Sequence, residues 1–202
     1  MIGAHDTYTY LKSTNWFINM FSLFWKCQIK SIEELYQLGV RVFDIRVIRT
    51  KDNKWQCGHG LAKVNRYFDD LDDICRYFKI NFKNSYIRII LESGGNEEEI
   101  VNIFKDEAES VINKYDKTLW QIYIKSPWTK LYNQEKIKCI DYCCHLFNWN
   151  LDLTFKENLK RINLKAWNIK SWAKYNNPKI TKEMIENPNI IHLIDYVGVY
   201  PK

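Results

Sequence analysis

Short runs of β-branched residues alternate with segments of helical spacing along this chain. VRVFDIRVI at 40–48 and SYIRIILE at 85–92 are rich in β-branched residues, which is typical of strands buried in a sheet. The intervening segment FDDLDDICRYFKINF at 68–82 has the apolar spacing of a helix. Because strands and helices that alternate in this way usually pack as a parallel sheet covered by helices, the pattern predicts an α/β fold.

Further segments continue the alternation. We expect strands at 55–59, 119–125, 137–141 and 190–197, helices at 31–38, 96–115, 153–162 and 179–186, and a further hydrophobic segment at 164–169. The helix at 31–38 would begin with a capping box formed by Ser31 and Glu34. No linker rich in proline, glycine or serine interrupts the 202 residues. We therefore expect one domain, residues 1–202, folded as a small, distorted or incomplete TIM-like (β/α) barrel with a mainly parallel sheet.

Charge and cysteine content narrow the class of protein only slightly. The net charge of +6 is spread along the sequence, so it favours anionic partners in general and singles out none. The six cysteines lack the spacing of zinc-binding pairs and follow no signal peptide, which favours free thiols in a reducing compartment. The most apolar stretch, at 15–25, is shorter than the roughly 20 residues that span a bilayer. We expect a cytoplasmic or peripheral membrane protein, and a monomer.

Several charged residues stand in apolar surroundings. Asp44 and Arg46 lie two positions apart in VFDIRV, which places them on one face of a strand, and Asp195 lies in HLIDYV. Burying a charged group costs free energy unless it is paired, so these residues need a partner or a function. Together with His5, Asp6 and His59 they could form a common polar site, which would provide both.

Four motifs resemble the phosphatidylinositol-specific phospholipase C family. IGAHDTYTY is similar to that family's opening strand and loop, LGVRVFDIRV to its next strand, GHGL to its second histidine motif, and FDDLDDICRYFKINFKNSYIRIILE to the following helix and strand. Their order and spacing fit over about 90 residues, which makes the combined signal stronger than any single motif. NNPKI and HLIDYVG resemble the family's last helix and strand, whereas the likeness fades between 95 and 170.

The resemblance implies a metal-independent, bacterial-type enzyme that converts phosphatidylinositol, or a glycosylated form of it, to diacylglycerol and a cyclic inositol phosphate. Imidazole has a pKa suited to both proton transfers of this reaction. By resemblance, His5 is the general base that acts on the inositol 2-hydroxyl and His59 the general acid toward the leaving oxygen. Asp195 would orient His5, Asp6 would lie between His59 and the leaving oxygen, and Arg46 would bind the phosphate.

The same resemblance bears on metal dependence. Eukaryotic relatives bind calcium at positions that match Asp6, Asp44, Arg46 and Glu92, and here a fixed cation replaces one of those ligands. We therefore expect no metal and no other cofactor. Calcium remains the alternative, because three carboxylates are still present and because the bacterial type usually has lysine where Glu92 stands.

Three carboxylates are candidates for substrate binding. Asp141, in the motif CIDYC, matches a carboxylate that binds inositol hydroxyls, and Glu92 and Asp44 would lie nearby. Tyr142 and Lys125 are weaker candidates. Asp44 could instead serve only as a structural partner of a neighbouring arginine.

An aromatic segment at 15–25 falls where the family carries a short interfacial helix. On a helix its large apolar side chains would share one side, and we expect membrane contact through Trp16, Phe17, Phe21 and Trp25. The alternative is a purely structural helix that packs against the core. Under the membrane hypothesis the partners are the phosphoinositide substrate and a membrane surface.

Two other functions remain open. The same pair of histidines could act on another phosphodiester with a neighbouring hydroxyl, such as a ribonucleotide. The chain could also be a catalytically silent module that binds anionic membranes or nucleic acid, although the full set of polar residues argues against silence. No recognised RNA-binding motif is present, so we expect no nucleic-acid partner. We interpret His145 and His192 as structural residues.

Overall fold

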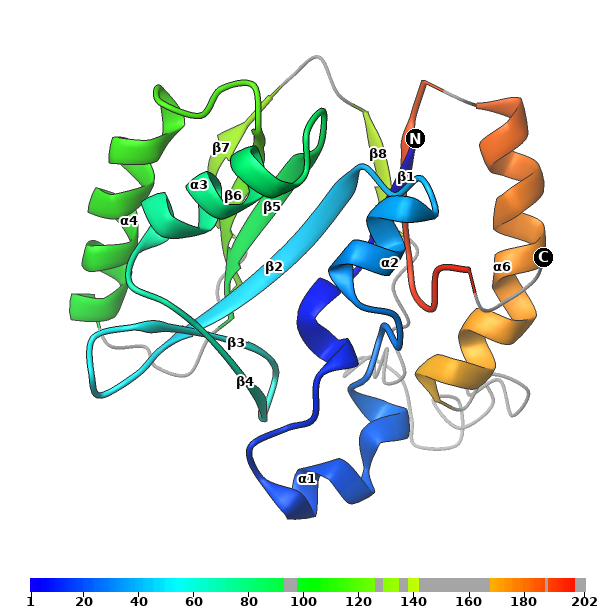
Figure 1. Ribbon diagram of the computed structural model, residues 1–202, viewed down its shortest axis with the longest axis horizontal. Coiled ribbons are helices and arrows are strands. Elements are labelled where there is room, and N and C mark those ends of the chain that lie inside the picture. Colours follow the sequence, from blue (N-terminus) through cyan, green and yellow to red (C-terminus); the bar gives the residue numbers. More distant parts are fainter. Residues whose placement is uncertain (93–97, 126–128, 135–137, 142–167, 188, 199–202) are drawn as a thin grey trace, which may run out of the picture.

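Figure 1 shows the protein as a computed structural model, which describes residues 1–92, 98–125, 129–134, 138–141, 168–187 and 189–198. A twisted, mainly parallel sheet of nine strands lies at its centre. The strand order is β7-β6-β5-β2-β1-β9-β8, and β3 and β4 extend from β2 as an antiparallel hairpin. The strands are β1 (Ile2–Ala4), β2 (Val42–Arg49), β3 (Trp55–His59), β4 (Ala62–Phe68), β5 (Tyr86–Leu91), β6 (Leu119–Ile124), β7 (Thr129–Asn133), β8 (Cys139–Asp141) and β9 (Ile191–Ile194).

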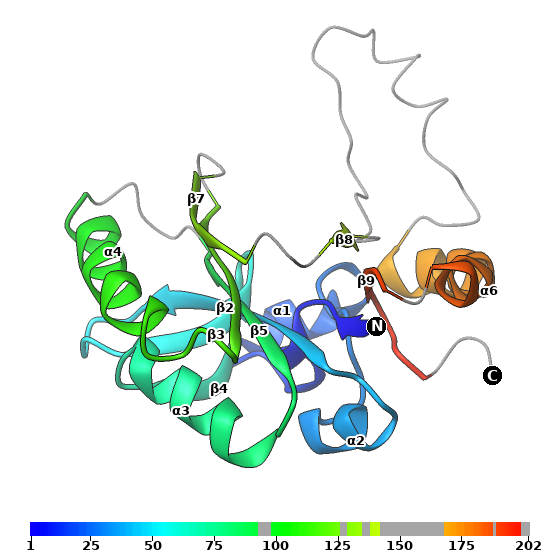
Figure 2. The same cartoon turned by 90° about the horizontal axis from the view of Figure 1, so that it is seen from above.

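Among the described residues, four helices lie around this sheet. They are α2 (Ile32–Gln37), α3 (Leu71–Asn81), α4 (Glu98–Ile112) and α6 (Ile169–Glu186). Figure 2 shows α4, α3, α2 and α6 following one another around the outside of the curved sheet. Within the described ranges the end strands β7 and β8 do not pair with each other, so the sheet is a curled half-barrel. The predicted α/β class, with a mainly parallel and incomplete TIM-like barrel, is confirmed.

The central strands are buried because both faces of the sheet are covered. β2 is buried at every position except its last, and β5 at every position except its first. Phe43 of β2 packs against Phe78 and Phe82, with ring centroids 5.4 and 5.6 Å apart. Burial of one such aromatic side chain is worth about 1.5–3 kcal/mol. This is why the two strands appear in the sequence as almost continuous apolar runs.

Most helix boundaries follow the sequence. Ser31 accepts a hydrogen bond from the backbone N–H of Glu34, and the Glu34 side chain accepts one from the backbone N–H of Ser31, so the predicted capping box is confirmed. Asp70 caps α3 in the same manner through the backbone N–H of Asp73. Both caps satisfy backbone donors that the first turn of a helix leaves without partners.

The structure also differs from the expected elements. β4 and β7 were not predicted, and α6 begins at Ile169 rather than at 179. The expected helix at 153–162 and nearly all of the segment at 164–169 lie outside the described residues. The aromatic segment forms two short helices instead of one, α1 (Trp16–Met20) and η2 (Ser22–Phe24), after η1 (Thr7–Tyr10). Across the described ranges, no helix combines the length and the apolar character needed to cross a bilayer.

Candidate active site

The polar residues singled out by the sequence meet near the carboxyl ends of β1, β5 and β9, beside β2 and the end of the antiparallel strand β3. They are His5 after β1, Asp44 and Arg46 in β2, His59 at the end of β3, Glu92 after β5, and Asp195 after β9. In α/β barrels the carboxyl ends of the strands share one rim, so side chains far apart in the sequence come together there. The short helix α1 lies on the same side of the molecule, at the lower edge of Figure 1.

His5 is held between a carboxylate and a guanidinium. Its Nδ1 lies 2.9 Å from Oδ1 of Asp195, and its Nε2 lies 2.6 Å from Nη2 of Arg46. A guanidinium only donates hydrogen bonds, so the Arg46 contact is a hydrogen bond when Nε2 carries a lone pair. This geometry assigns the tautomer in which Nδ1–H donates to Asp195 and Nε2 is the basic nitrogen.

The charges around His5 act on its pKa in opposite directions. Burial by itself lowers the pKa, but the carboxylates of Asp6 and Asp195 outweigh burial and raise the pKa of His5 well above its usual value. Arg46 opposes this rise. The pKa of this ring is therefore set by the charged groups in direct contact with it.

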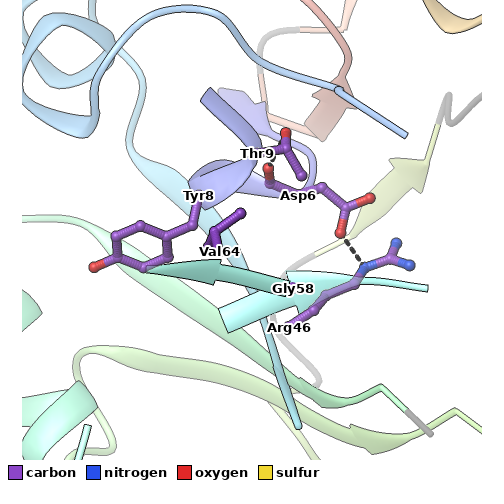
Figure 3. Close-up of a pocket in the computed structure, with 6 residues that line it drawn as sticks. All are labelled: Asp6, Tyr8, Thr9, Arg46, Gly58 and Val64. Carbon is purple, nitrogen blue, oxygen red and sulfur yellow. Dashed lines mark hydrogen bonds and ion pairs between the residues drawn. The ribbon is translucent and has the colours of Figure 1, made fainter. Parts of the chain in front are cut away.

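Arg46 lies among three carboxylates. Its Nε contacts Oδ1 of Asp6 and lies 3.4 Å from Oδ2 of Asp44, while its Nη1 lies 3.3 Å from Oε2 of Glu92. Figure 3 shows the carboxylate of Asp6 in direct contact with the guanidinium, beside a small cavity that both residues line. Burial lowers the pKa of Arg46, but these carboxylates outweigh burial and raise it. The guanidinium is thus a permanent cation in the site.

This arrangement tests the alternative of a calcium site. The resemblance places calcium ligands at Asp6, Asp44 and Glu92, and Arg46 contacts all three of these carboxylates. Calcium needs six to eight oxygen ligands, and here the shared space between the three carboxylates is filled by a cation that the chain itself supplies. The residues do not fit a calcium site of that kind.

A second buried arginine was missed by the sequence analysis. Arg88 of β5 lies opposite Asp44 in the parallel pairing of β2 and β5, and its Nε donates to Oδ1 of Asp44 at 2.8 Å. Burial raises the pKa of Asp44, but Arg88 and Arg46 outweigh burial and hold it far below its usual value. Asp44 is therefore an anion that fixes two cations, which agrees with the structural role considered for it.

Asp6 adopts a backbone conformation that is rare for a residue with a side chain. Its φ is 45° and its ψ is 57°, in the left-handed region, and its backbone N–H donates to Oδ2 of Asp44 at 3.2 Å. This turn places Oδ2 of Asp6 3.3 Å from Nδ1 of His5 and 3.4 Å from Nε2 of His59. Burial raises the pKa of Asp6, whereas Arg46 and the two histidines lower it, and the net pKa is lowered.

His59 is the more exposed of the two histidines in the site. Its Nδ1 lies 2.7 Å from the backbone oxygen of Trp25, so Nδ1–H donates there and Nε2 faces Asp6. The rings of His5 and His59 are nearly perpendicular, with centroids 6.4 Å apart. Two imidazoles thus face the same space from different strands, each with one nitrogen fixed by a partner and the other turned toward the site.

Trp25 is wrong as a predicted membrane contact. Its side chain is only 7% exposed, and its Nε1 donates to the backbone oxygen of Ile18 at 3.0 Å. The segment turns after Phe24, so Trp25 faces the core while its carbonyl holds His59. The other three residues of that prediction are exposed, and Trp16 reaches 74%. The exposed apolar group, which we call the aromatic rim, comprises Trp16, Phe17, Met20, Phe21, Leu23 and Phe24.

Gln28 lies in the loop after the aromatic rim and joins two parts of the site. Gln28 is buried, and its Nε2 donates to the backbone oxygens of His5 at 3.0 Å and Ile194 at 2.9 Å. Its Oε1 accepts a hydrogen bond from the backbone N–H of Val197 at 3.1 Å. Gln28 therefore joins the strand ends that carry His5 and Asp195. No sequence pattern had pointed to it.

Cys27 contributes a buried thiol. Its Sγ donates to Oδ2 of Asp6 at 3.4 Å and lies 3.8 Å from Nδ1 of His59. Burial, together with the charges of Asp195 and Asp6, raises the pKa of Cys27 well above its usual value, so the thiol is protonated at neutral pH. No motif or spacing in the sequence had placed this cysteine at the site.

The three predicted substrate-binding carboxylates differ in their placement. Glu92 is buried, and its Oε1 accepts from the backbone N–H of Gly60 at 2.8 Å and contacts Nζ of Lys125. Lys125, a weaker candidate, therefore belongs to the site. Asp141 ends β8, paired with Leu193 of β9, so its backbone lies beside the strand that leads to Asp195. Tyr142 lies outside the described residues, as does His145, while His192 is buried with Nε2 3.2 Å from the oxygen of Asn187.

The small cavity in Figure 3 does not accommodate a substrate. Its volume is about 10 Å³, close to the lower limit for one water molecule. The lining residues are Asp6, Tyr8, Thr9, Arg46, Gly58 and Val64. A larger ligand would therefore have to approach from the outer side of the two imidazoles, where His59 is partly exposed.

Comparisons with known proteins bear on the fold. No protein-family model matches the sequence, and no curated protein matches it. Among solved structures, a phosphatidylinositol-specific phospholipase C of Staphylococcus aureus, studied for the modulation of its membrane binding, superimposes with a TM-score of 0.57 at 16% identity, covering 100% of this chain and 87% of that chain. The corresponding enzyme of Listeria monocytogenes gives a TM-score of 0.55 at 15% identity, covering 97% of this chain and 87% of that chain. The chain therefore shares the fold of these bacterial phospholipases.

Proposed function

We propose that this chain is a phosphodiesterase of the two-histidine type that cleaves phosphatidylinositol, or a glycosylated form of it, without a metal ion. The observation that carries the proposal is the pairing of His5 with Asp195 and Arg46 on one side of a site whose other side is His59. The shared fold with bacterial phosphatidylinositol-specific phospholipases C supports it.

In the proposed first step His5 acts as the general base. Its Nε2 takes the proton of the inositol 2-hydroxyl, whose oxygen then attacks phosphorus. Asp195 stabilises the imidazolium that forms, because its carboxylate already accepts the Nδ1 proton at 2.9 Å. Substrate must first separate Nε2 of His5 from Arg46, and a phosphate oxygen that accepts the Arg46 hydrogen bond would do this.

His59 acts as the general acid on the opposite side of phosphorus. Its Nδ1–H is fixed by the carbonyl of Trp25, so the proton delivered to the diacylglycerol oxygen is the one on Nε2. Oδ2 of Asp6 lies 3.4 Å from that nitrogen, so it can accept a hydrogen bond from Nε2–H and hold the ring in position. The P–O bond to diacylglycerol breaks, and a five-membered cyclic phosphate forms on the inositol. Water can open this ring in a second step with the two histidines in reversed roles.

Arg46 supplies the charge that the transition state requires. The three carboxylates that surround the guanidinium fix its position before substrate arrives, so little reorganisation is needed when negative charge develops on the phosphate. Glu92 and Lys125, at the end of neighbouring strands, are the groups we assign to inositol contacts together with Asp141.

The aromatic rim is the proposed membrane-contact surface. Six large apolar side chains are exposed within nine consecutive positions, and Lys12 and Lys26 flank them. Thr14, just before the rim, donates through its backbone N–H to the oxygen of Lys63 in β4 at 2.7 Å, which fixes the rim beside the hairpin that carries His59. A surface of this composition favours an anionic lipid interface, which holds the substrate.

Phosphorus NMR of the purified protein with phosphatidylinositol vesicles in chelator tests the proposal. We expect a cyclic phosphate signal with the wild type and none with His5→Ala or His59→Ala. His192→Gln is the matched control, because His192 is a buried histidine outside the site, and circular dichroism checks the folding of all three variants. Activity retained by both site variants would contradict the assignment. Cleavage of a ribonucleotide diester but not of the vesicles would retain the reaction type and correct the substrate.

A further inference from the structure

The proposed reaction gives no role to Cys27, although its thiol lies against two of the catalytic groups. Sγ is 3.4 Å from Oδ2 of Asp6, and Oδ2 of Asp6 is 3.4 Å from Nε2 of His59. Cys27, Asp6 and His59 each offer one potential ligand atom, and the three atoms lie within 4.8 Å of one another. Thiolate, imidazole and carboxylate are the three ligand types that zinc prefers in proteins.

These separations match a tetrahedral zinc site. Zinc binds sulfur at about 2.3 Å and nitrogen or oxygen at about 2.0–2.1 Å, so two ligand atoms on one ion lie roughly 3.3–3.5 Å apart. The two contacts of Oδ2 with the thiol and with Nε2 are both 3.4 Å. The sulfur lies 3.8 Å from Nδ1 of His59, so side-chain rotation must bring the sulfur and Nε2 onto one ion.

The donor atoms are also oriented for a cation. Nδ1–H of His59 donates to the carbonyl of Trp25, which leaves the lone pair on Nε2, and metal-binding histidines are commonly fixed by such a bond through the other nitrogen. The two oxygens of Asp6 have different neighbours: Oδ1 contacts Arg46, while Oδ2 lies near the thiol of Cys27, Nε2 of His59 and Nδ1 of His5. Arg46 and an ion at Oδ2 would thus use different oxygens of one carboxylate.

We propose that Asp6, Cys27 and His59 bind a thiophilic divalent cation such as Zn²⁺, and that this ion inhibits the enzyme. On binding, the S–H bond of Cys27 breaks, a Zn–S bond forms, and the proton passes to solvent, with no change of oxidation state. The ion occupies Nε2 of His59, so this residue can no longer protonate the leaving oxygen. The inhibition rests on the proposed function, whereas the binding site does not.

This site is distinct from the calcium site considered above. Calcium requires oxygen ligands among the carboxylates that Arg46 already occupies, whereas zinc would bind on the opposite side of Asp6 through sulfur and nitrogen. His59, with a side chain that is 20% exposed, gives the ion a path from solvent and leaves a position for a water ligand. We therefore expect Zn²⁺ to bind and Ca²⁺ or Mg²⁺ not to compete with it.

Direct binding tests the site without any substrate. Cobalt(II) replaces zinc as a spectroscopic probe, because a cobalt–thiolate bond gives a charge-transfer band in the near ultraviolet. We expect this band and one equivalent of Zn²⁺ by calorimetry for the wild type and for Cys75→Ser, a buried cysteine of α3 outside the site. For Cys27→Ser we expect loss of the band and at least tenfold weaker zinc binding. Unchanged binding by Cys27→Ser, or none by the wild type, would overturn the proposal.

Activity measurements separate the inhibition from the function. Zn²⁺ should abolish cleavage of phosphatidylinositol vesicles by the wild type and by Cys75→Ser, with recovery on addition of chelator. Whatever activity Cys27→Ser shows in chelator, that activity should not fall when zinc is added. Cleavage by the wild type that does not respond to zinc would refute the inhibition. If zinc binds through Cys27 and no phosphodiester is cleaved, the metal site stands and the proposed function fails.

Discussion

Nη2 of Arg46 lies 2.6 Å from Nε2 of His5, on the side of the ring opposite to Asp195. The guanidinium favours the neutral ring and the carboxylate favours the imidazolium, and both act at short range in a buried site where screening is weak. The opposing effects of Arg46 and Asp195 therefore set the pH above which His5 is neutral and can act as a base.

The pH profile should report this balance. Asp195→Asn removes a charge that raises the pKa of His5, so the acid limb of kcat/KM should move to lower pH. Arg46→Met removes the opposing charge, so the acid limb should move to higher pH. Rates on a water-soluble phosphatidylinositol analogue, with an NMR titration of the His5 ring, measure both shifts. Shifts of the same sign in the two variants would contradict the assigned geometry.

Loss of the Arg46 guanidinium should also lower the rate of the chemical step. Removing one preorganised donor to a developing oxyanion typically costs about 100- to 1,000-fold in kcat. We expect a loss of that size for Arg46→Met, with a smaller change in KM. Arg76→Met, at an exposed arginine of α3, should leave kcat unchanged. Equal effects of the two substitutions would show that net charge, and not position, matters.

The aromatic rim should determine the affinity for membranes. Phe17→Ser removes an exposed aromatic ring that we place at the lipid interface, and partial burial of such a ring is worth about 1–2 kcal/mol, which corresponds to roughly tenfold in affinity. Sedimentation with phosphatidylinositol-containing vesicles measures the change. Ile80→Ser is the matched control, since Ile80 is 65% exposed on α3. The hypothesis fails if both variants bind vesicles as the wild type does.

The correctly predicted parts of the fold are those whose burial produces a recognisable pattern of apolar residues in the sequence, or whose helix start has a capping motif. β2 and β5 are covered on both faces and have near-continuous apolar runs, and the cap at Ser31 has its own pattern. β4 was missed although its burial alternates, because the expected helix was extended back to residue 68. β7 is an edge strand with no fully buried residue, and α6 contains Pro178, which argues against a helix interior.

The site was predictable to the extent that its charges interrupt apolar runs. Asp44 and Arg46 were found in this way, and Arg88 could have been, because it interrupts SYIRIILE as they interrupt VRVFDIRVI. Cys27 and Gln28 lie in a loop without periodicity, so only the folded chain shows that they reach the site. Trp25 was predicted on the wrong side because one continuous helix was assumed through residue 25. In the structure the short helix η2 ends at Phe24, so the side chain of Trp25 points elsewhere.

Gln28 should contribute to stability through the hydrogen bonds that join two strand ends. Gln28→Ala leaves the carbonyls of His5 and Ile194 and the N–H of Val197 without this partner in a buried location. An unsatisfied buried group costs about 1–3 kcal/mol, so we expect the free energy of unfolding to fall by at least about 2 kcal/mol. Denaturant unfolding measures the change. Gln37→Ala, at an exposed position of α2, should change it little, and a similar small change for Gln28→Ala would contradict this role.

Asp44 should make the fold sensitive to acid. Its pKa in the folded protein is held far below the value of 3.8 expected for the unfolded chain, because Arg88 and Arg46 stabilise the carboxylate. A depressed pKa contributes stability at pH values above the pKa of the unfolded chain, and this contribution is lost as the pH falls below that value.

At neutral pH, Asp44→Asn should cost about 3–5 kcal/mol by leaving buried arginine charge without its partner. The difference in unfolding free energy between wild type and Asp44→Asn should therefore shrink from about pH 4 downward. Urea denaturation across this range measures it, with Asp52→Asn as the exposed control, and a difference independent of pH would show that Asp44 is not charged in the fold.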